Sequence, residues 1–204
     1  MIRTITIGGE HGSGREEIGR LLAEGLGWKL LDDALIEEIA AMTHVDPSVA
    51  KHYDECLDTW LHEVHKALWR GGYEGLATTT GSDILDADRI AECARSIIES
   101  AARKGGRVIV GRGGQCVLQE YPDVFHVFIY APRRERLERL RRTLGPNADV
   151  TAAMDSMDHI RRAYTRRHYG QEWTDRHLYD MMLCSSMGEA AAAAAILAAL
   201  GREV

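Results

Sequence analysis

The sequence predicts an α/β fold built on a parallel sheet of about five strands, and three observations support this prediction. Short runs of β-branched and other apolar residues alternate with helical patterns along most of the chain. A glycine-dense turn joins the first of these runs to the first helical segment. Polar residues also cluster after three of the runs, at the strand ends where parallel sheets bind their ligands. Together these features favour an enzyme that handles a phosphate-bearing ligand.

Five strands are predicted from the apolar runs, over residues 2–7, 28–31, 107–111, 124–130 and 180–184. The first run is apolar enough to be buried on both faces, as strands of parallel sheets are. Helices are predicted over residues 14–26, 34–42, 90–103, 132–144, 150–168 and 188–200, with a short helix ending at residue 118. Glycines mark helix ends: Gly27 follows the first helix, and Gly170 follows the helix at 150–168.

The length of 204 residues fits a single domain with a substantial core. Residues 43–88 interrupt the alternation with a helical pattern and a loose connection rich in glycine and threonine, so we interpret them as a helical insertion. The core then comprises residues 1–42 and 89–204. No metal site is predicted, because the four cysteines are scattered and His62 and His65 have no further ligand in view.

The composition is that of ordinary soluble globular protein, with 45% hydrophobic and 27% charged residues. A net charge of −6 gives no reason to expect a nucleic-acid partner. The longest apolar stretch, residues 190–200, is too short to span a bilayer, and no targeting signal precedes the first strand. We therefore expect a cytoplasmic protein without a membrane partner, either a monomer or a homodimer.

Arginine dominates the basic residues: 21 of the 25 are Arg, and eleven of those lie between Arg133 and Arg176. The planar guanidinium makes bidentate contacts with phosphate, so a phosphate ligand explains this bias. A solvated helix face, or a genome that favours Arg codons over Lys codons, explains it as well.

The first glycine-rich turn has the spacing of a phosphate-binding loop. From Gly9 the pattern reads G-x-x-x-x-G, and the next residue is Arg15, where this loop motif normally has Lys. Glu16 and Glu17 follow where Ser or Thr is expected. Backbone N–H groups between a strand and a helix bind phosphate readily, so we predict nucleotide binding by Gly9, Gly12, Ser13, Gly14 and Arg15. A glycine-rich turn without a ligand is the alternative.

Two further clusters follow predicted strands. Asp32 comes directly after residues 28–31, and it either caps the next helix or contacts the substrate. Gly111-Arg112-Gly113 follows the strand at 107–111. The carboxyl ends of parallel strands meet at one edge of a sheet, so both clusters should converge with the first loop.

With these residues considered together, the chain resembles the cytidylate kinase-like family within the P-loop nucleoside monophosphate kinases. The resemblance spans nearly the whole chain, in the same order. The matching pieces are Thr4-Ile5-Thr6-Ile7, Gly12-Ser13-Gly14, Leu22-Ala23, Leu26-Gly27, Leu31-Asp32, Val110-Gly111-Arg112, Val127-Phe128-Ile129-Tyr130-Ala131-Pro132, Arg161, Tyr164, Gly170, Trp173 and Tyr179-Asp180.

The resemblance implies a P-loop NTPase fold, three-layered α/β/α, in which residues 43–88 bind the nucleoside monophosphate and residues 133–176 form an arginine-rich lid. It implies ATP and Mg²⁺ as cofactors and CMP or dCMP as the acceptor. Arg112 and Asp32 would bind that acceptor, and Arg15, Arg112 and Arg161 would be catalytic. The lid role falls to arginines of that region, namely Arg139, Arg142, Arg161, Arg162 and Arg166. Well-studied cytidylate kinases carry Lys and Thr where this chain has Arg15 and Glu17, and kinase-like relatives often have Gly in place of that Lys.

Two other functions remain open at this point. The first is a kinase of another small metabolite, because a phosphate loop and arginines recognise phosphate rather than a base. The second is a nucleotide-binding regulator without turnover, which the carboxylates Glu16 and Glu17 beside the loop favour.

Overall fold

A five-stranded parallel sheet forms the centre of the fold. The computed structural model of the chain describes residues 1–32, 81–145 and 148–202. The strands lie in the order β2-β3-β1-β4-β5 and pair in parallel throughout. They are β1 (Thr4–Gly9), β2 (Lys29–Leu31), β3 (Arg107–Val110), β4 (Val124–Tyr130) and β5 (Met181–Cys184). The predicted α/β fold with five parallel strands is confirmed.

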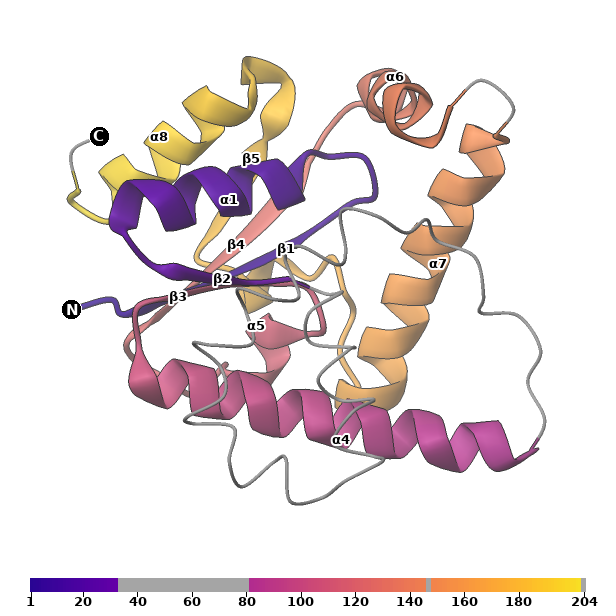
Figure 1. Cartoon of the computed structure of the whole chain (residues 1–204), viewed down its shortest axis with the longest axis horizontal. Coiled ribbons are helices and arrows are strands. Elements are labelled where there is room, and N and C mark those ends of the chain that lie inside the picture. Colours follow the sequence, from indigo (N-terminus) through magenta and orange to yellow (C-terminus); the bar gives the residue numbers. More distant parts are fainter. Residues whose placement is uncertain (33–80, 146–147, 203–204) are drawn as a thin grey trace. The chain divides into compact units, whose positions relative to one another are not determined.

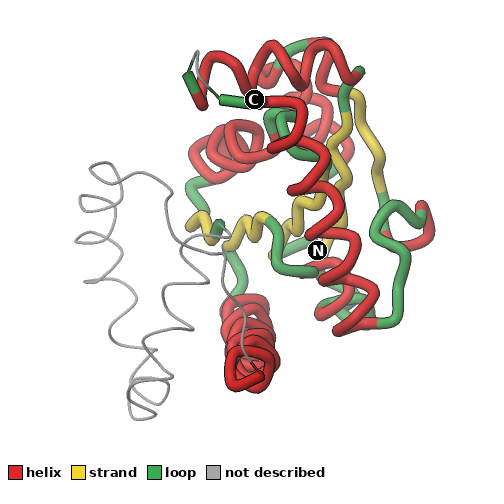
Figure 2. Tube along the Cα trace, turned by 90° about the vertical axis from the view of Figure 1, so that its right-hand side faces the viewer, coloured by secondary structure: helices red, strands yellow, loops and turns green. Residues whose placement is uncertain are grey.

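Helices cover both faces of this sheet (Figure 1). On one face lie α1 (Arg15–Leu26) and α8 (Glu189–Ala199), and on the other lie α5 (Gly114–Val117) and residues 95–104 of α4 (Gly81–Lys104). Between β4 and β5 come α6 (Arg133–Leu144), α7 (Val150–Tyr169) and the 3₁₀ turn η1 (Arg176–Leu178); η2 (Ser185–Met187) follows β5. Figure 2 shows the same layering from the side. None of the described helices is long and apolar enough to cross a membrane.

The chain divides into two compact units, Met1–Ile36 with Arg95–Val204, and Glu37–Ala94. The first unit contains the sheet and the helices that pack on it. In the second, the described residues are 81–94, which form the first part of α4. The predicted helix at 34–42 and residues 43–80 of the predicted insertion lie outside the described residues.

Most element ends fall within two residues of the sequence prediction, and two differences are informative. The helix predicted over 90–103 begins at Gly81, because no glycine or proline after Gly81 interrupts it before Gly105. The first strand, predicted to end at residue 7, continues through Gly8 and Gly9, which pair with β4. Glycine is required at Gly9, since a Cβ there would lie 2.5 Å from the carbonyl oxygen of Ile129.

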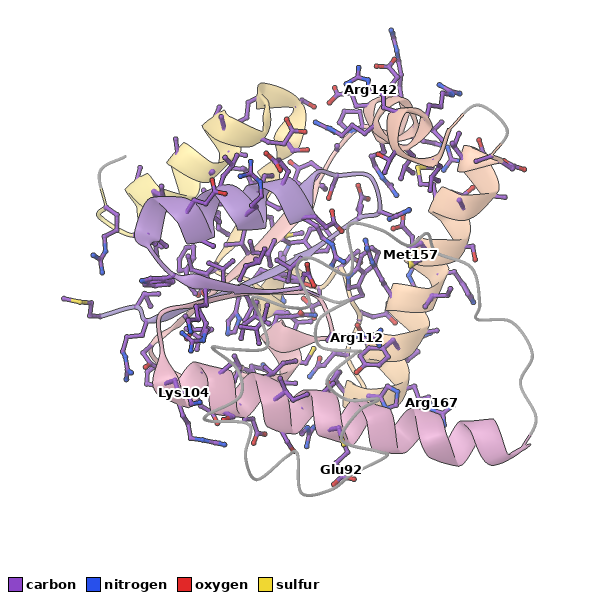
Figure 3. All side chains as sticks on the ribbon, viewed as in Figure 1. Glu92, Lys104, Arg112, Arg142, Met157 and Arg167 are labelled. Carbon is purple, nitrogen blue, oxygen red and sulfur yellow. The ribbon has the colours of Figure 1, made fainter. Side chains whose placement is uncertain are left out.

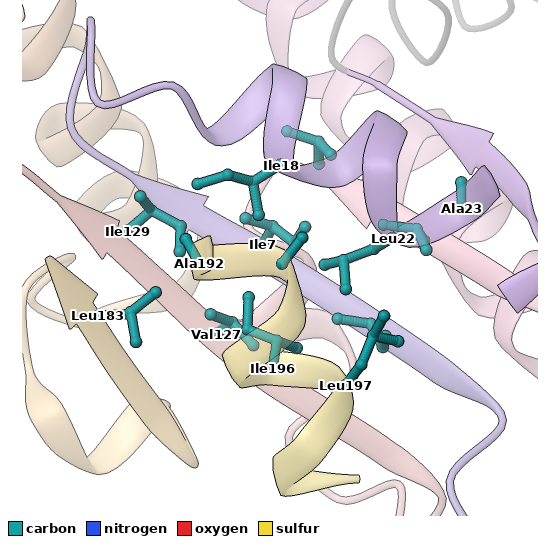
Figure 4. Close-up of a cluster of buried hydrophobic side chains, with 14 residues drawn as sticks. Ile7, Ile18, Leu22, Ala23, Val127, Ile129, Leu183, Ala192, Ile196 and Leu197 are labelled. Carbon is teal, nitrogen blue, oxygen red and sulfur yellow. The ribbon is translucent and has the colours of Figure 1, made fainter. Parts of the chain in front are cut away.

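The main hydrophobic core lies between the sheet and the helices α1 and α8 (Figure 4). Ile18 and Leu22 of α1 and Ile196 of α8 are completely buried. Ile18 and Leu22 are four residues apart and therefore lie on one face of α1, the face that packs on the sheet. Burial of each such side chain contributes about 1.5–3 kcal/mol, so this layer fixes the position of α1 and of the loop that precedes it.

A smaller cluster and a buried histidine lie elsewhere in the sheet unit. Phe128, Trp173 and Tyr179 pack their rings together, and the Tyr179 hydroxyl donates to the Trp173 carbonyl over 2.7 Å. His126 of β4 is 8% exposed, and its Nδ1 lies 2.6 Å from the hydroxyl of Thr6. Burial lowers the pKa of His126, so the ring is neutral at physiological pH.

Candidate phosphate-binding site

A tight, glycine-dependent loop connects β1 to α1. Gly12 and Gly14 have φ values of 78° and 82°, which side chains other than glycine rarely adopt. The Glu10 N–H donates to the Ile129 carbonyl over 3.0 Å, and the Ser13 N–H donates back to the Glu10 carbonyl over 3.1 Å. The predicted order of strand, glycine-rich loop and helix is confirmed; phosphate binding by its residues stays a prediction.

Arg15 occupies the position at which the motif has its lysine, and its side chain is buried next to the loop. Its side chain is almost fully buried, with 2% of the residue exposed, and Nε donates to Glu16 Oε1 over 2.9 Å. The Arg15 Cδ would lie 3.3 Å from a Cβ on Gly9, so the missing side chain at Gly9 leaves room for the arginine. The charge of Arg15 is thus fixed against the loop, and its contact with ATP stays a prediction.

Arg161 reaches the same loop from α7. Its Nη1 donates to the Gly9 carbonyl over 2.9 Å, and its Nη2 lies 3.6 Å from Glu16 Oε1. Desolvation acts to raise the pKa of Glu16, but the positive charges of Arg15 and Arg161 outweigh it and hold that pKa below its ordinary value. Two arginines and one ionised carboxylate therefore meet at the loop.

A second network holds the other side of the loop, and the sequence did not predict it. Arg136 of α6 is 6% exposed; its Nε donates to the His11 carbonyl over 2.8 Å, and its Nη1 lies 3.3 Å from Glu10 Oε2. Asp158 of α7 pairs with Arg136 and accepts from the His11 N–H over 2.8 Å. Burial first, and then the charge of Arg161, lower the pKa of His11.

The sequence did contain a signal for these two residues. Arg136 stands four positions before the buried Leu140, so both lie on the same face of α6. Asp158 stands three positions before Arg161 on α7, which places its carboxylate and that guanidinium on one face. The helix faces on which Arg136 and Asp158 lie could be predicted from the sequence. The contact of both faces with the loop could not be predicted.

Two buried serines, Ser13 in the loop and Ser185 after β5, are joined by a hydrogen bond. Ser185 and Ser13 are fully buried, and the Ser185 hydroxyl donates to the Ser13 carbonyl over 2.6 Å. Among the described residues, Ser13 Oγ has no hydrogen-bond partner. A buried hydroxyl without a partner is unusual and often marks the place of a ligand. Ser185 was not predicted, because it lies far from the loop in sequence.

The second glycine-rich turn follows β3 and contains Arg112. Arg112 has a φ of 49°, the one positive value among the described non-glycine residues. Its guanidinium carbon lies 5.6 Å from the centre of the Tyr164 ring, alongside the C-terminal half of α7 (Figure 3). A Cβ on Gly113 would lie 2.4 Å from the Tyr169 ring, so glycine there allows α7 to approach. Arg112 is thus held between the sheet edge and α7.

Asp32 directly follows β2, which pairs with β3. Because β2, β3 and β1 are parallel neighbours, spaced about 4.8 Å apart, Asp32, Arg112 and the first loop follow the same edge of the sheet. That convergence agrees with the expectation from sequence. The helix that Asp32 might otherwise cap, predicted over 34–42, lies outside the described residues.

The remaining arginines of the predicted lid have other surroundings. Arg139 donates to Glu189 over 2.9 Å and to the Ser185 carbonyl over 3.2 Å, and Arg166 lies 2.5 Å from Glu172. Arg142 and Arg162 are exposed. Of the five arginines assigned to the lid, Arg161 is therefore the one whose guanidinium donates to a loop carbonyl, within the part of the chain that the structure describes.

No cluster of three metal-binding side chains is present in the described ranges 1–32, 81–145 and 148–202. Glu16, which stands where the motif has its magnesium-binding hydroxyl, directs its carboxylate to two arginines instead. The residues present thus fit the phosphate part of a nucleotide better than a metal ion bound by protein side chains.

Comparison with known sequences connects most of the chain to one family. A model of the cytidylate kinase-like family matches residues 4–187. Over 100 residues the chain is 31% identical to a cytidylate kinase from Shewanella sediminis (strain HAW-EB3), which covers 48% of this chain and 44% of that protein. The corresponding protein from Shewanella oneidensis is 28% identical over the same length, with the same coverage. The match thus covers less than half the length of these curated relatives.

Solved structures show similarity over the whole chain. An uncharacterized protein from Eubacterium ventriosum ATCC 27560 superposes with a TM-score of 0.68 and 21% identity, covering 98% of this chain and 99% of that one. Shikimate kinase from Bacteroides thetaiotaomicron gives a TM-score of 0.54 and 16% identity, with the same coverage. At these identities the similarity shows the fold alone, and it agrees with the predicted α/β fold with a five-stranded parallel sheet.

Proposed function

This chain belongs to the cytidylate kinase-like family, and on that premise we propose that it transfers a phosphoryl group from ATP to a nucleoside monophosphate, with CMP and dCMP as the foremost acceptors. One observation carries the proposal. Arg161 donates to the carbonyl of Gly9 at the glycine loop, while Arg112 lies beside the same helix at the next strand end. Two arginines thus flank the edge where a parallel sheet binds ligands.

The donor nucleotide binds the first loop in this proposal. Gly9, Gly12, Ser13 and Gly14 place backbone groups at the N-terminus of α1, where helix dipole and free N–H groups favour phosphate. Arg15 supplies fixed positive charge below the loop. The Ser13 hydroxyl, which has no hydrogen-bond partner in the part of the chain that the structure describes, supports this assignment, because a buried polar atom without a partner fits a site that a ligand completes.

The acceptor phosphate binds at Arg112, with Asp32 at the next strand end contacting the acceptor molecule. Arg112 stands in a turn whose neighbouring glycine allows close approach of the backbone. Arg161, between the two loops, acts on the phosphoryl group as charge redistributes during transfer. Such transfer needs little covalent assistance, because positioning and charge stabilisation provide most of the catalysis.

Magnesium enters this scheme with the nucleotide. We assign MgATP as the substrate, because the loop offers Glu16 and Glu17 where a magnesium-binding hydroxyl is usual. The chain's own contribution is then to bind the phosphates, orient the acceptor and exclude water from the phosphoryl group.

Two alternatives keep specific support. A kinase of another small metabolite is favoured by Arg15, Arg112 and Arg161, because arginines recognise phosphate rather than a base. A nucleotide-binding regulator without turnover is favoured by the ion pairs of Glu16 with Arg15 and Arg161, which leave the loop partly neutralised.

A panel of acceptors assayed with ATP and Mg²⁺ tests the proposal. Formation of a nucleoside diphosphate, fastest with CMP or dCMP, is the expected result. Arg112→Ala should then raise the KM for the acceptor more than it lowers kcat, because it removes a contact to a phosphate present before and during transfer. Phosphorylation of other metabolites alone would establish the first alternative. Nucleotide binding without any turnover would establish the second.

A further inference from the structure

The Glu16 carboxylate is shared by two arginines at the glycine loop. Arg15 Nε donates to Glu16 Oε1 over 2.9 Å, and Arg161 Nη2 lies 3.6 Å from the same oxygen. The side chains of Arg15 and Arg161 are 3% and 15% exposed, whereas that of Glu16 is 55% exposed. The carboxylate therefore lies on the solvent side of two largely buried cations.

An anion that approaches from solvent meets the same two guanidinium groups. Arginine recognises carboxylate and phosphate with the same planar donors, so either anion suits this position. Glu16 also stands in the first turn of α1, where the helix dipole favours any negative charge. One set of donors thus fits both anions, but the same place cannot hold both.

A second, independent observation points to a ligand here. The hydroxyl of Ser13 is fully buried and lacks a partner among the described residues. It lies 3.2 Å from the place of a Cβ on Gly9, and the Arg15 Cδ lies 3.3 Å from the same place. This hydroxyl and the Arg15 side chain thus both approach Gly9, whose carbonyl accepts from Arg161.

We propose that Glu16 is an internal occupant of the phosphate site, held between Arg15 and Arg161 until a phosphate of the nucleotide displaces it. The inference rests on the proposed function, because it takes the ligand to be ATP or ADP. Exchange of one anion for another keeps the buried cations paired throughout, whereas removal of Glu16 alone would leave Arg15 without this partner. The altered loop thus binds nucleotide in competition with its own side chain.

The opposite role for Glu16 predicts the opposite result. If its carboxylate helped to hold the nucleotide, directly or through magnesium-bound water, its removal would weaken binding. If it occupies the phosphate site, its removal strengthens binding. The sign of one change in affinity therefore decides between the two roles.

The experiment is calorimetric titration of the whole protein with ATP and with ADP, each with and without Mg²⁺. Glu16→Gln should lower the Kd by about tenfold, since one charge-assisted contact no longer has to be displaced. Glu17→Gln is the matched control: it removes the same charge one residue away, where the carboxylate pairs with Arg20 on the exposed face of α1. Its Kd should stay near that of the parent.

Glu16→Ser removes the reach of the side chain as well as its charge, and it should gain at least as much affinity as Glu16→Gln. Thermal unfolding of each variant shows that it is folded. Unchanged or weaker binding in both Glu16 variants, with a parent that binds nucleotide, overturns this inference and leaves the proposed function standing. Absence of nucleotide binding in parent and variants alike overturns both.

Discussion

Arg161 differs from the other arginines of α7 by its surroundings and not by its chemistry. Its side chain is 15% exposed and donates to a loop carbonyl, whereas Arg167, two turns further along the helix, is exposed. A helix turns 100° per residue, so a change of a few positions moves a side chain from one face to another. The catalytic assignment of Arg161 therefore rests on its place on the helix.

This assignment predicts an asymmetric effect of two substitutions. Arg161→Ala should lower kcat by about 10³-fold on an acceptor that the parent phosphorylates, the usual scale for loss of an arginine that stabilises the transferring group. Arg167→Ala, the matched control on the same helix, should retain parental kcat. Steady-state kinetics at saturating ATP measure both. Similar rates for parent and Arg161→Ala would remove Arg161 from the mechanism.

At the scale of elements, α7 is the helix that joins the two glycine-rich turns. Asp158 and Arg161 contact the first loop, and Tyr164 and Tyr169 pack against Arg112 and its neighbour in the second turn. Asp158, Arg161 and Tyr164 are spaced by three residues, and Tyr169 follows Asp158 by eleven residues, or about three turns, so all four side chains lie on one side of the helix. The conformation of both turns therefore depends on the contacts that hold α7 in place.

Asp158 should contribute strongly to the attachment of α7, because it pairs with Arg136 and accepts from the His11 N–H. Asp158→Asn removes one of the two carboxylates that pair with the largely buried Arg136, the other being Glu10, so we expect the free energy of unfolding to fall by about 1–3 kcal/mol. Asp155→Asn on the same helix breaks an exposed pair with Arg133 and should cost about 0–1 kcal/mol. Urea unfolding compares the two variants with the parent. Equal losses would show that Asp158 is no more than another surface carboxylate.

The sequence predicts those elements well whose ends are marked by local features, such as the limits of an apolar run or a glycine after a helix. The strand at 124–130 is apolar except for His126 and was predicted at its observed bounds, and Gly170 ends α7 as expected. The glycine loop was predictable as well, because its glycines mark it in the sequence between an apolar run and a helical pattern. Arg161 was selected from the eleven arginines only through the family resemblance and Arg136 was missed, because the helix faces that meet the loop are set by the folded chain.

At the scale of the whole molecule, buried neutral histidines make stability depend on pH. Burial lowers the pKa of both His126 and His11. Between their lowered values and the ordinary value of about 6.5, the unfolded chain binds protons that the folded chain does not. Stability is therefore unaffected by these groups above about pH 6.5 and falls as pH decreases below it.

Thermal unfolding between about pH 7.5 and 5 measures this effect, in a range above the titration of most carboxyl groups. The parent should lose melting temperature as pH falls, and His126→Asn should lose less, since it removes one of the two groups. His177→Asn replaces an exposed histidine and should follow the parent. A His126→Asn profile parallel to the parent would show that His126 does not contribute to the acid sensitivity.

The hydrogen bond from Ser185 to Ser13 joins residues 172 positions apart. During synthesis the N-terminal part of a chain emerges first, so β1 and its loop leave the ribosome long before the strands that flank them. Thr4 pairs with Arg107 on one side and Val124 on the other, and pairings at such separation form slowly. The part of the protein that is made first is therefore completed among the last, and a nascent chain that stops before Ser185 has the sequence of the nucleotide loop without its full support.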